Sequence, residues 1–236
     1  MAVKYVGRFC KQAIISRAAT FSRHFKMSAS TPALIALNCD DGKELLKTST
    51  YRQDDIIKYF GKQKHRTMCG LQTAAIVMNA MKLNSDSLYR EETMFDLQPT
   101  LSVLDKSKVE TRGCTLQEKS DLYRAFNLDV ETYHASDSSE EEFRQIVKKT
   151  LVQSNCESTM VINYHMDVLG QGVPVGHISP LAAYHQGSDR ILLMDVWPDT
   201  YELWAPTKDL FNAMNTINTV DNKSRGYIVV KQKKKL

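Results

Sequence analysis

A cysteine at the start of a helix is a candidate nucleophile, and Cys69 fits this pattern. It is followed by Gly70 and by an apolar run that reaches Met81. A helix N-terminus presents free N–H groups and a partial positive charge, which favour a thiolate over a thiol, and one of those N–H groups can bind an oxyanion. A small buried hydrophobic residue is the alternative interpretation of Cys69.

Gln63 lies six residues before Cys69 and is a candidate for the oxyanion hole. Its side-chain amide would act together with the Cys69 N–H, and one such donor contributes about 3 kcal/mol to transition-state stabilisation. The alternative interpretation is a surface glutamine.

His177 and Asp195 are expected on the two strands of one hairpin. A turn centred on Gln186 would place them directly opposite each other, with Cβ atoms ~5 Å apart. A centre at Gly187 would make them diagonal neighbours on one face. A tight turn centred between Gly187 and Ser188 would put them on opposite faces.

Burial gives a second reason to pair these two residues. Asp195 follows Leu192, Leu193 and Met194 in an apolar strand, and a lone buried carboxylate is costly. A carboxylate that holds an imidazole fixes its tautomer and supports the imidazolium that pairs with a thiolate. His177 is the best partner, although a purely structural His–Asp pair would satisfy the same pattern.

The elements that must position these residues change character along the chain. Helical signals dominate the first half, and strand signals with period two dominate the second. We expect helices over 54–60, 70–81, from Thr115, from 138–142 onward and over 210–214, and strands over 159–164, 177–184, 191–196 and 226–230. This order predicts an α+β domain with a helical lobe and an antiparallel sheet lobe.

Composition excludes several other classes of protein. The 236 residues are 42% hydrophobic and 25% charged with a net charge of +4, an ordinary globular balance without an extended nucleic-acid footprint. The five cysteines include no C-x-x-C pair, which argues against a disulfide scaffold and a structural zinc site and favours a reducing compartment. No apolar run approaches the ~20 residues of a membrane span.

The two ends of the chain are basic. Residues 1–31 contain lysines and arginines but no acidic residue, and apolar residues recur at helical spacing. This pattern predicts either a mitochondrial targeting segment or a disordered basic leader; a start at Met27 would give a cytoplasmic form. We therefore expect a leader over 1–31, a catalytic domain over 32–230 and a basic tail over 231–236.

The candidate motifs together resemble the phytochelatin synthase family, whose members have a papain-like fold. The segments that carry the resemblance are 63–81 around Cys69, 176–181 around His177, 193–196 around Asp195, the closing segment 225–227, and Tyr201, Trp204 and Pro206. The resemblance covers about 32–230, essentially the whole expected domain.

The resemblance implies that the chain acts on glutathione. Cys69 would attack the Cys-Gly bond, release glycine and hold a γ-glutamylcysteinyl thioester that a second glutathione takes up. His177 would act as base and then acid, Asp195 would orient it, and Gln63 would stabilise the oxyanion. Substrate contacts are expected at Gly70, Gly176 and Tyr201. Cadmium or zinc would take part as a glutathione thiolate complex, with no covalently bound cofactor and no dedicated metal site in the protein.

Two positions depart from the family pattern. His65 stands where the family commonly has an acidic residue, and Pro198 stands where it has an arginine. These departures, and a length without the cysteine-rich C-terminal domain of plant-type enzymes, keep two alternatives open. One is a hydrolase that removes glycine from glutathione or its conjugates, and the other is an inactive papain-like binding module. Neither a nucleic-acid nor a membrane partner is expected, and a homodimer is possible.

Overall fold

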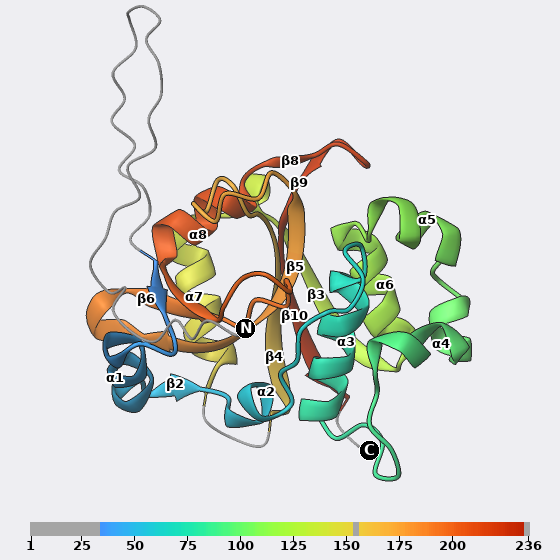
Figure 1. The fold of residues 1–236 in the computed structure, drawn as a ribbon, viewed down its shortest axis with the longest axis horizontal. Helices are drawn as coiled ribbons and strands as arrows, with labels where there is room; N and C mark the ends of the chain where they lie inside the picture. Colours follow the sequence, from blue (N-terminus) through green and yellow to red (C-terminus); the bar gives the residue numbers. More distant parts are fainter. Residues whose placement is uncertain (1–33, 153–155, 234–236) are drawn as a thin grey trace, which may run out of the picture. The chain divides into compact units, whose positions relative to one another are not determined.

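An antiparallel sheet of eight strands forms the centre of the described part of the chain (Figure 1). The structure is a computed structural model that describes residues 34–152 and 156–233. The expected leader over 1–31 lies outside these residues, as do residues 234–236 of the expected tail. Helices and an antiparallel sheet confirm the α+β class.

The strands lie in the order β1-β7-β6-β5-β4-β10-β3, and β2 pairs with β5 outside this path. The bounds are β1 (Ile35–Ala36), β2 (Tyr51–Arg52), β3 (Leu128–His134), β4 (Ser158–His165), β5 (Gly176–His185), β6 (Arg190–Leu193), β7 (Leu203–Pro206) and β10 (Gly226–Gln232). A separate two-stranded sheet joins β8 (Ile217–Asn218) to β9 (Lys223–Ser224).

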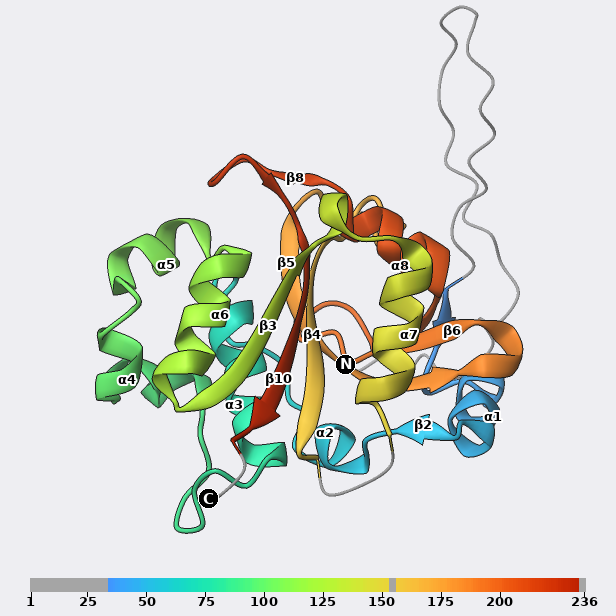
Figure 2. The same cartoon turned by 180° about the vertical axis from the view of Figure 1, so that it is seen from behind.

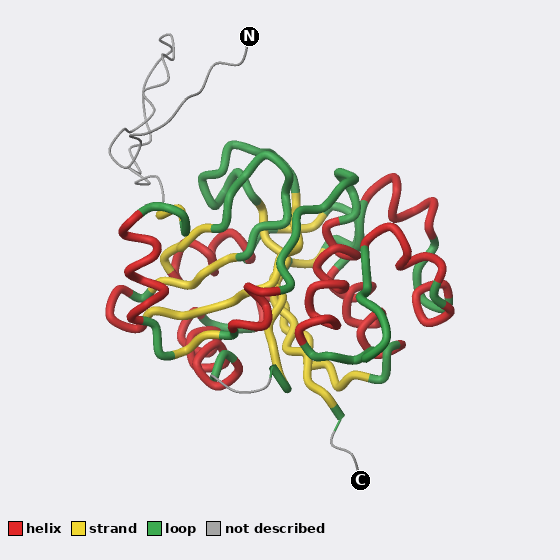
Figure 3. Tube along the Cα trace, turned by 60° about the horizontal axis from the view of Figure 1, so that its bottom comes forward, coloured by secondary structure: helices red, strands yellow, loops and turns green. Residues whose placement is uncertain are grey.

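The α-helices lie on both sides of this sheet, as Figures 2 and 3 show. They are α1 (Asp40–Thr48), α2 (Asp54–Lys58), α3 (Cys69–Ala80), α4 (Gln98–Leu101), α5 (Lys106–Arg112), α6 (Leu116–Ala125), α7 (Glu140–Thr150) and α8 (Thr207–Met214). The 3-10 turns are η1 (Glu91–Asp96), η2 (Ala135–Asp137) and η3 (Gln186–Ser188). None of the described helices is long and apolar enough to cross a membrane.

The sheet separates two hydrophobic clusters because successive strand residues point to opposite faces. In β10, Ile228 belongs to the cluster that contains α3, whereas Tyr227 and Val229 belong to the cluster that contains α7 and α8. Val161 of β4 likewise faces α3. Side chains that leave the sheet on the α3 side can therefore meet the N-terminus of that helix.

Local sequence signals explain where the principal helices begin. Thr115 caps α6 and Ser139 caps α7, each in a reciprocal capping box with a glutamate three residues later. Both starts were expected from the sequence. No sequence pattern indicated α1, α5, β3 or β7, and β6 ends at Leu193, earlier than expected.

Candidate functional site

Helix α3 begins at Cys69 and places its thiol where the free N–H groups of the first turn lie. The side chain is 7% exposed. The backbone N–H groups of Gly70 and of Ile178 in β5 both interact with the sulfur. The predicted helix start is confirmed, and the sulfur faces polar groups of the neighbouring strand.

The turn of the β5–β6 hairpin is not centred on Gln186. His185 pairs with Arg190, so the centre lies between Gly187 and Ser188. In a regular hairpin this centre would send the histidine and the aspartate to opposite faces of the sheet. The directly opposed register does not occur.

A β-bulge in β5 restores the common face. The pairing shifts by one residue between Leu181 and Ala183, so that Leu181 lies opposite Leu193. Two residues further on, past the end of β6, Asp195 reaches the face that carries His177. The Nε2 atom of His177 donates to Oδ1 of Asp195 at 2.9 Å.

The Asp195 carboxylate is completely buried and accepts four hydrogen bonds. Besides His177, Oδ1 accepts from the backbone N–H of Trp197 at 2.9 Å. Oδ2 accepts from Thr200 Oγ1 at 2.7 Å and from Gln171 Nε2 at 2.5 Å. This set of donors compensates for desolvation of the carboxylate and fixes its position beside the imidazole.

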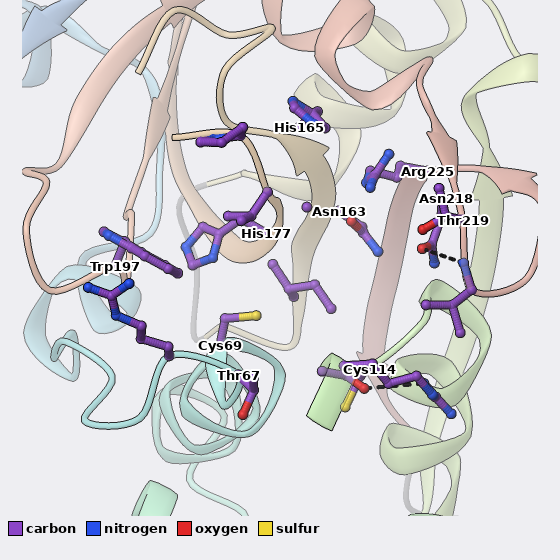
Figure 4. A pocket seen from close by; sticks show the side chains of 18 of the residues that line it. Thr67, Cys69, Cys114, Asn163, His165, His177, Trp197, Asn218, Thr219 and Arg225 are labelled. Atoms are coloured by element: carbon purple, nitrogen blue, oxygen red, sulfur yellow. Dashed lines mark hydrogen bonds between the residues drawn. The ribbon is translucent and has the colours of Figure 1, made fainter. Parts of the chain in front are cut away.

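The second ring nitrogen of His177, Nδ1, is directed towards Cys69. Nδ1 is buried and has no hydrogen-bonding partner of its own among the nitrogen and oxygen atoms of the described residues. The thiol of Cys69 interacts with this ring. Figure 4 shows the ring of His177 above the sulfur of Cys69 in the same pocket. Cysteine, histidine and aspartate therefore lie in sequence, as in a nucleophile–base–orienter arrangement.

The electrostatics favour the ionised pair. Burial by itself would raise the pKa of the Cys69 thiol, but the hydrogen bond and charge of His177 outweigh burial, and the pKa lies below its usual value. Burial lowers the pKa of His177, whereas the Asp195 and Cys69 side chains raise it, to a net value of about 9. Burial opposes ionisation of Asp195 too, yet bonding to His177 keeps its pKa low.

Gln63 is buried, and its amide makes contacts that the sequence did not suggest. Nε2 donates to the carbonyl oxygens of His65 at 2.8 Å and of Arg66 at 2.9 Å. Both amide hydrogens are thereby directed at the loop that precedes Cys69, and Gln63 is not among the residues that line the pocket. The oxyanion role of Gln63 stays a prediction, because it would require the amide to leave these carbonyls.

The pocket over Cys69 and His177 has a volume of about 570 Å³. Of the predicted substrate contacts, Gly176 lines it, whereas Gly70 and Tyr201 do not. Gly70 lies behind the nucleophile with Cys114 packed against it. Tyr201 is 56% exposed.

Several lining residues were not identified from the sequence as site residues. Arg66, Arg112 and Arg225 bring positive charge to the walls, and Asn163 and His165 of β4 bring polar atoms. Figure 4 shows Asn163, His165 and Arg225 on the side of the pocket formed by the sheet. Arg225 is the first residue of the closing segment 225–227, so the sequence motif included it without indicating a role in the pocket.

The departure at His65 lies in the loop before the nucleophile. The backbone N–H of His65 donates to Oε1 of Glu91 at 3.0 Å, and that of Lys64 donates to Oε2 at 2.8 Å. Buried Glu91 thus anchors this loop from outside it. Pro198, the second departure, is exposed in the loop after Asp195. Among the residues 34–152 and 156–233, no group of three or more histidine, cysteine, aspartate or glutamate side chains forms a metal site.

A cysteine beside a buried His–Asp pair on an α+β scaffold is the arrangement of cysteine-nucleophile enzymes as a class. Comparison with known proteins gives the particular family. The family model described as phytochelatin synthase matches residues 25–227, and the chain therefore belongs to the phytochelatin synthase family. The resemblance identified from the sequence motifs is confirmed.

Curated relatives carry the name glutathione gamma-glutamylcysteinyltransferase. Enzyme 1 of Lotus japonicus is 29% identical over 182 residues, covering 74% of this chain and 35% of the relative. Enzyme 1 of Arabidopsis thaliana is 28% identical over 218 residues, covering 87% and 43%. The Schizosaccharomyces pombe protein is 29% identical over 175 residues, covering 71% and 40%. The matched part is less than half the length of these relatives.

Proposed function

We propose that this chain is a γ-glutamylcysteinyltransferase that acts on glutathione through a Cys69–His177–Asp195 triad on a papain-like fold. The observation that carries the proposal is the buried His177–Asp195 pair beside a thiol at a helix N-terminus, within a member of the phytochelatin synthase family. The papain-like assignment is supported by a nucleophile helix that packs against the strand supplying the histidine.

The proposed reaction begins with the Cys69 thiolate, whose proton resides on His177. The sulfur attacks the carbonyl carbon of the Cys-Gly peptide bond, and the oxyanion that forms is stabilised by N–H groups of the first turn of α3. His177 gives its proton to the glycine nitrogen, the C–N bond breaks, and a γ-glutamylcysteinyl thioester remains on Cys69. Asp195 keeps the imidazole oriented throughout.

The second half of the proposed reaction transfers the acyl group. Neutral His177 accepts a proton from the α-amino group of a second glutathione, whose nitrogen attacks the thioester carbonyl. The Cys69 sulfur leaves as the thiolate, and the product is one γ-glutamylcysteine unit longer than the acceptor. Water in place of the amine would release γ-glutamylcysteine.

Positive charge in the pocket suits a substrate with two carboxylates. Arg225 is held in place because its Nη1 donates to Thr216 Oγ1 at 3.0 Å and to the Ile217 carbonyl at 2.6 Å. Its Nη2 and Nε atoms lie 2.7 and 2.8 Å from where a Cβ on Gly176 would stand. A side chain at position 176 would therefore displace the guanidinium. We infer that Gly176 acts by admitting Arg225, which binds a carboxylate of glutathione.

Cadmium or zinc is proposed to enter as part of the substrate. A thiolate complex of glutathione would present two substrate molecules to one pocket, and the protein would bind the peptide rather than the metal. This proposal is consistent with a pocket whose charged lining is cationic.

Incubation of the purified chain with millimolar glutathione, with and without cadmium, tests the function. We expect free glycine and γ-glutamylcysteine oligomers by mass spectrometry, with an acyl group on the peptide that contains Cys69. Cys69→Ser should release no glycine, because a hydroxyl is a poor nucleophile at its ordinary pKa. Its melting temperature should equal that of the wild type.

The products separate the alternatives. Glycine and γ-glutamylcysteine without oligomers would assign a hydrolase. Absence of glycine under both conditions would overturn the enzymatic proposal and leave a binding module. Wild-type activity in Cys69→Ser would refute the nucleophile.

A further inference from the structure

Lys119 of α6 is a buried lysine behind the candidate nucleophile. Its side chain has 0% exposure, and its Nζ atom donates to the carbonyl oxygen of Gly70 at 2.5 Å. Gly70 directly follows Cys69 in the first turn of α3. The ammonium also lies 4.1 Å from the centre of the Tyr123 ring. A lysine is almost never fully buried unless it is paired.

No carboxylate pairs with this ammonium. Among the described residues, the ion pairs do not include Lys119, although the chain forms many such pairs elsewhere. The titratable groups that act on it are two thiols, Cys114 and Cys69. Cys114 packs against Gly70 as well, with its sulfur 3.2 Å from where a Cβ on that glycine would stand.

The position of Lys119 is unfavourable for a purely structural role. A cation at a helix N-terminus opposes the partial positive charge of the helix. The Gly70 carbonyl lies inside α3, where the helix itself supplies a donor four residues later. An apolar side chain would fill the same space without the desolvation cost of an ammonium. The positive charge therefore calls for an anion nearby.

The net charge of the site identifies that anion as the Cys69 thiolate. The thiolate of Cys69, the imidazolium of His177 and the carboxylate of Asp195 together carry one net negative charge in a buried site. One ammonium makes the sum zero. After acylation the thioester and the imidazole are neutral, and Lys119 still balances Asp195.

We propose that Lys119 is a positioning residue for the acyl transfer, whose buried ammonium behind α3 stabilises the Cys69 thiolate and the oxyanion derived from it. It does not line the pocket, so it acts through the nucleophile and not on the substrate. The sulfur of Cys69 in turn favours the ammonium form of Lys119. Burial lowers the pKa of Lys119 to about 7, and the Cys114 and Cys69 sulfurs oppose this change. The expected effect on turnover rests on the proposed function, whereas the expected effect on the pKa of the Cys69 thiol rests on the structure alone.

The test compares Lys119→Met with Lys108→Met, a matched change at an exposed lysine of α5. Iodoacetamide labelling of Cys69, followed against pH by peptide mass spectrometry, reports its pKa without any substrate. We expect Lys119→Met to raise the pKa of Cys69, by up to about one unit, because it removes a cation bonded to the residue that follows Cys69. Lys108→Met should leave it unchanged. An unchanged pKa in Lys119→Met would overturn the proposal.

Stability and turnover give the second readout. Lys119→Met should still unfold in one cooperative transition, because methionine fills much of the space of the lysine side chain. Its kcat/KM for glycine release should fall by up to about tenfold below the pKa of the Cys69 thiol, and the deficit should shrink as pH rises and the thiolate forms without help. A lower melting temperature with an equal loss at every pH would show a structural lysine and overturn the inference.

A reciprocal measurement covers a variant that fails to fold. Removal of the thiolate in Cys69→Ser should lower the pKa of Lys119, observed by NMR of its labelled Nζ atom, since linkage between two sites acts in both directions. No change there would refute the pairing. If the wild type releases no glycine, the proposed function fails, while the labelling and NMR experiments still decide the role of Lys119.

Discussion

The sulfur of Cys69 is subject to two opposing effects, and their balance decides its chemistry. Desolvation favours the thiol, whereas His177 and two backbone N–H groups favour the thiolate. The second influence dominates because the imidazole is held by a fully buried carboxylate. A buried cysteine without this neighbour would be an inert hydrophobic residue. Half-buried Cys114 is a contrast, since it lacks a neighbouring imidazole among the described residues and desolvation raises its pKa to about 12.

The pH dependence of glycine release should reflect this balance. His177 must carry a proton to protonate the leaving amine, and its pKa is about 9. We therefore expect kcat/KM to fall on the alkaline side with a midpoint near pH 9, a macroscopic value that belongs to the interacting groups. Initial rates measured from about pH 7 to about pH 11, roughly two units on either side of this midpoint, check the prediction.

Asp195→Asn provides the diagnostic variant for that prediction. It removes the charge that raises the pKa of His177, so the alkaline midpoint should move to lower pH as the overall rate falls. Asp199→Asn, a change at an exposed carboxylate four residues later, should keep the wild-type midpoint. An unmoved midpoint in Asp195→Asn would count against the orienting role of this carboxylate.

At the scale of elements, the β5–β6 hairpin delivers the histidine and the aspartate to one face. Its turn alone would separate them, and the one-residue bulge between Leu181 and Ala183 brings them together. The backbone N–H of Gln53 donates to the carbonyl of Ala182 in this bulge at 2.8 Å. Contact with a segment remote in sequence thus satisfies the irregular backbone.

Asp189 stabilises the turn of the same hairpin through side-chain hydrogen bonds. Its carboxylate accepts two bonds from Arg144 of α7, each 2.9 Å long, and further bonds from Tyr184 and Thr207. Burial would raise the pKa of Asp189, but these donors, with Arg144 first among them, hold it below its usual value. The turn is thereby bonded to two helices, α7 through Arg144 and α8 through Thr207.

We expect Asp189→Asn to lower the free energy of unfolding by about 1 kcal/mol at pH 7, since the site is partly exposed and water screens the lost charge. Because the folded pKa lies below the unfolded one, the contribution is complete above about pH 4 and disappears as pH falls. Urea denaturation at pH 7 and pH 3 measures it. Asp129→Asn on β3 is the control, with a change below about 0.5 kcal/mol; an equal loss in both variants would contradict the role of the turn.

At the scale of the whole described domain, the sheet separates two helical layers, and β10, the last strand in sequence, pairs with both β4 and β3. Gly226 begins β10 between His134 of β3 and Asn163 of β4. A Cβ at Gly226 would stand 1.9 Å from the carbonyl oxygen of Tyr133. Backbone atoms cannot give way as a flexible side chain can, so the sheet would have to open there.

Gly226→Ala should therefore lower the free energy of unfolding by about 3 kcal/mol or more, a loss typical of a forced backbone clash. Gly61→Ala is the matched control, because its Cβ would meet only the end of the Gln72 side chain, at 3.2 Å, and no backbone atom. We expect a loss below about 1 kcal/mol in the control. Thermal and urea unfolding followed by circular dichroism check both values; equal stabilities would show that the strands separate more easily than the clash implies.

Elements with strong local signals could be predicted from the residue pattern. Capping boxes located the starts of α6 and α7, and apolar periodicity located α3 and the strands β4, β5 and β10. The residue pattern also singled out Cys69, His177 and Asp195, because each is a reactive or charged residue in an otherwise apolar element. These are short-range patterns, which neighbouring residues specify without help from the rest of the chain.

How those residues meet depends on the packing of segments that are distant in the chain. The bulge that gives His177 and Asp195 a common face depends on strand pairing, and the register cannot be deduced from a turn of unknown centre. The contacts of Gln63, the entry of Arg225 beside Gly176 and the burial of Lys119 arise between segments far apart in the chain. Their physical causes are desolvation and charge proximity, which exist only once the segments have packed together.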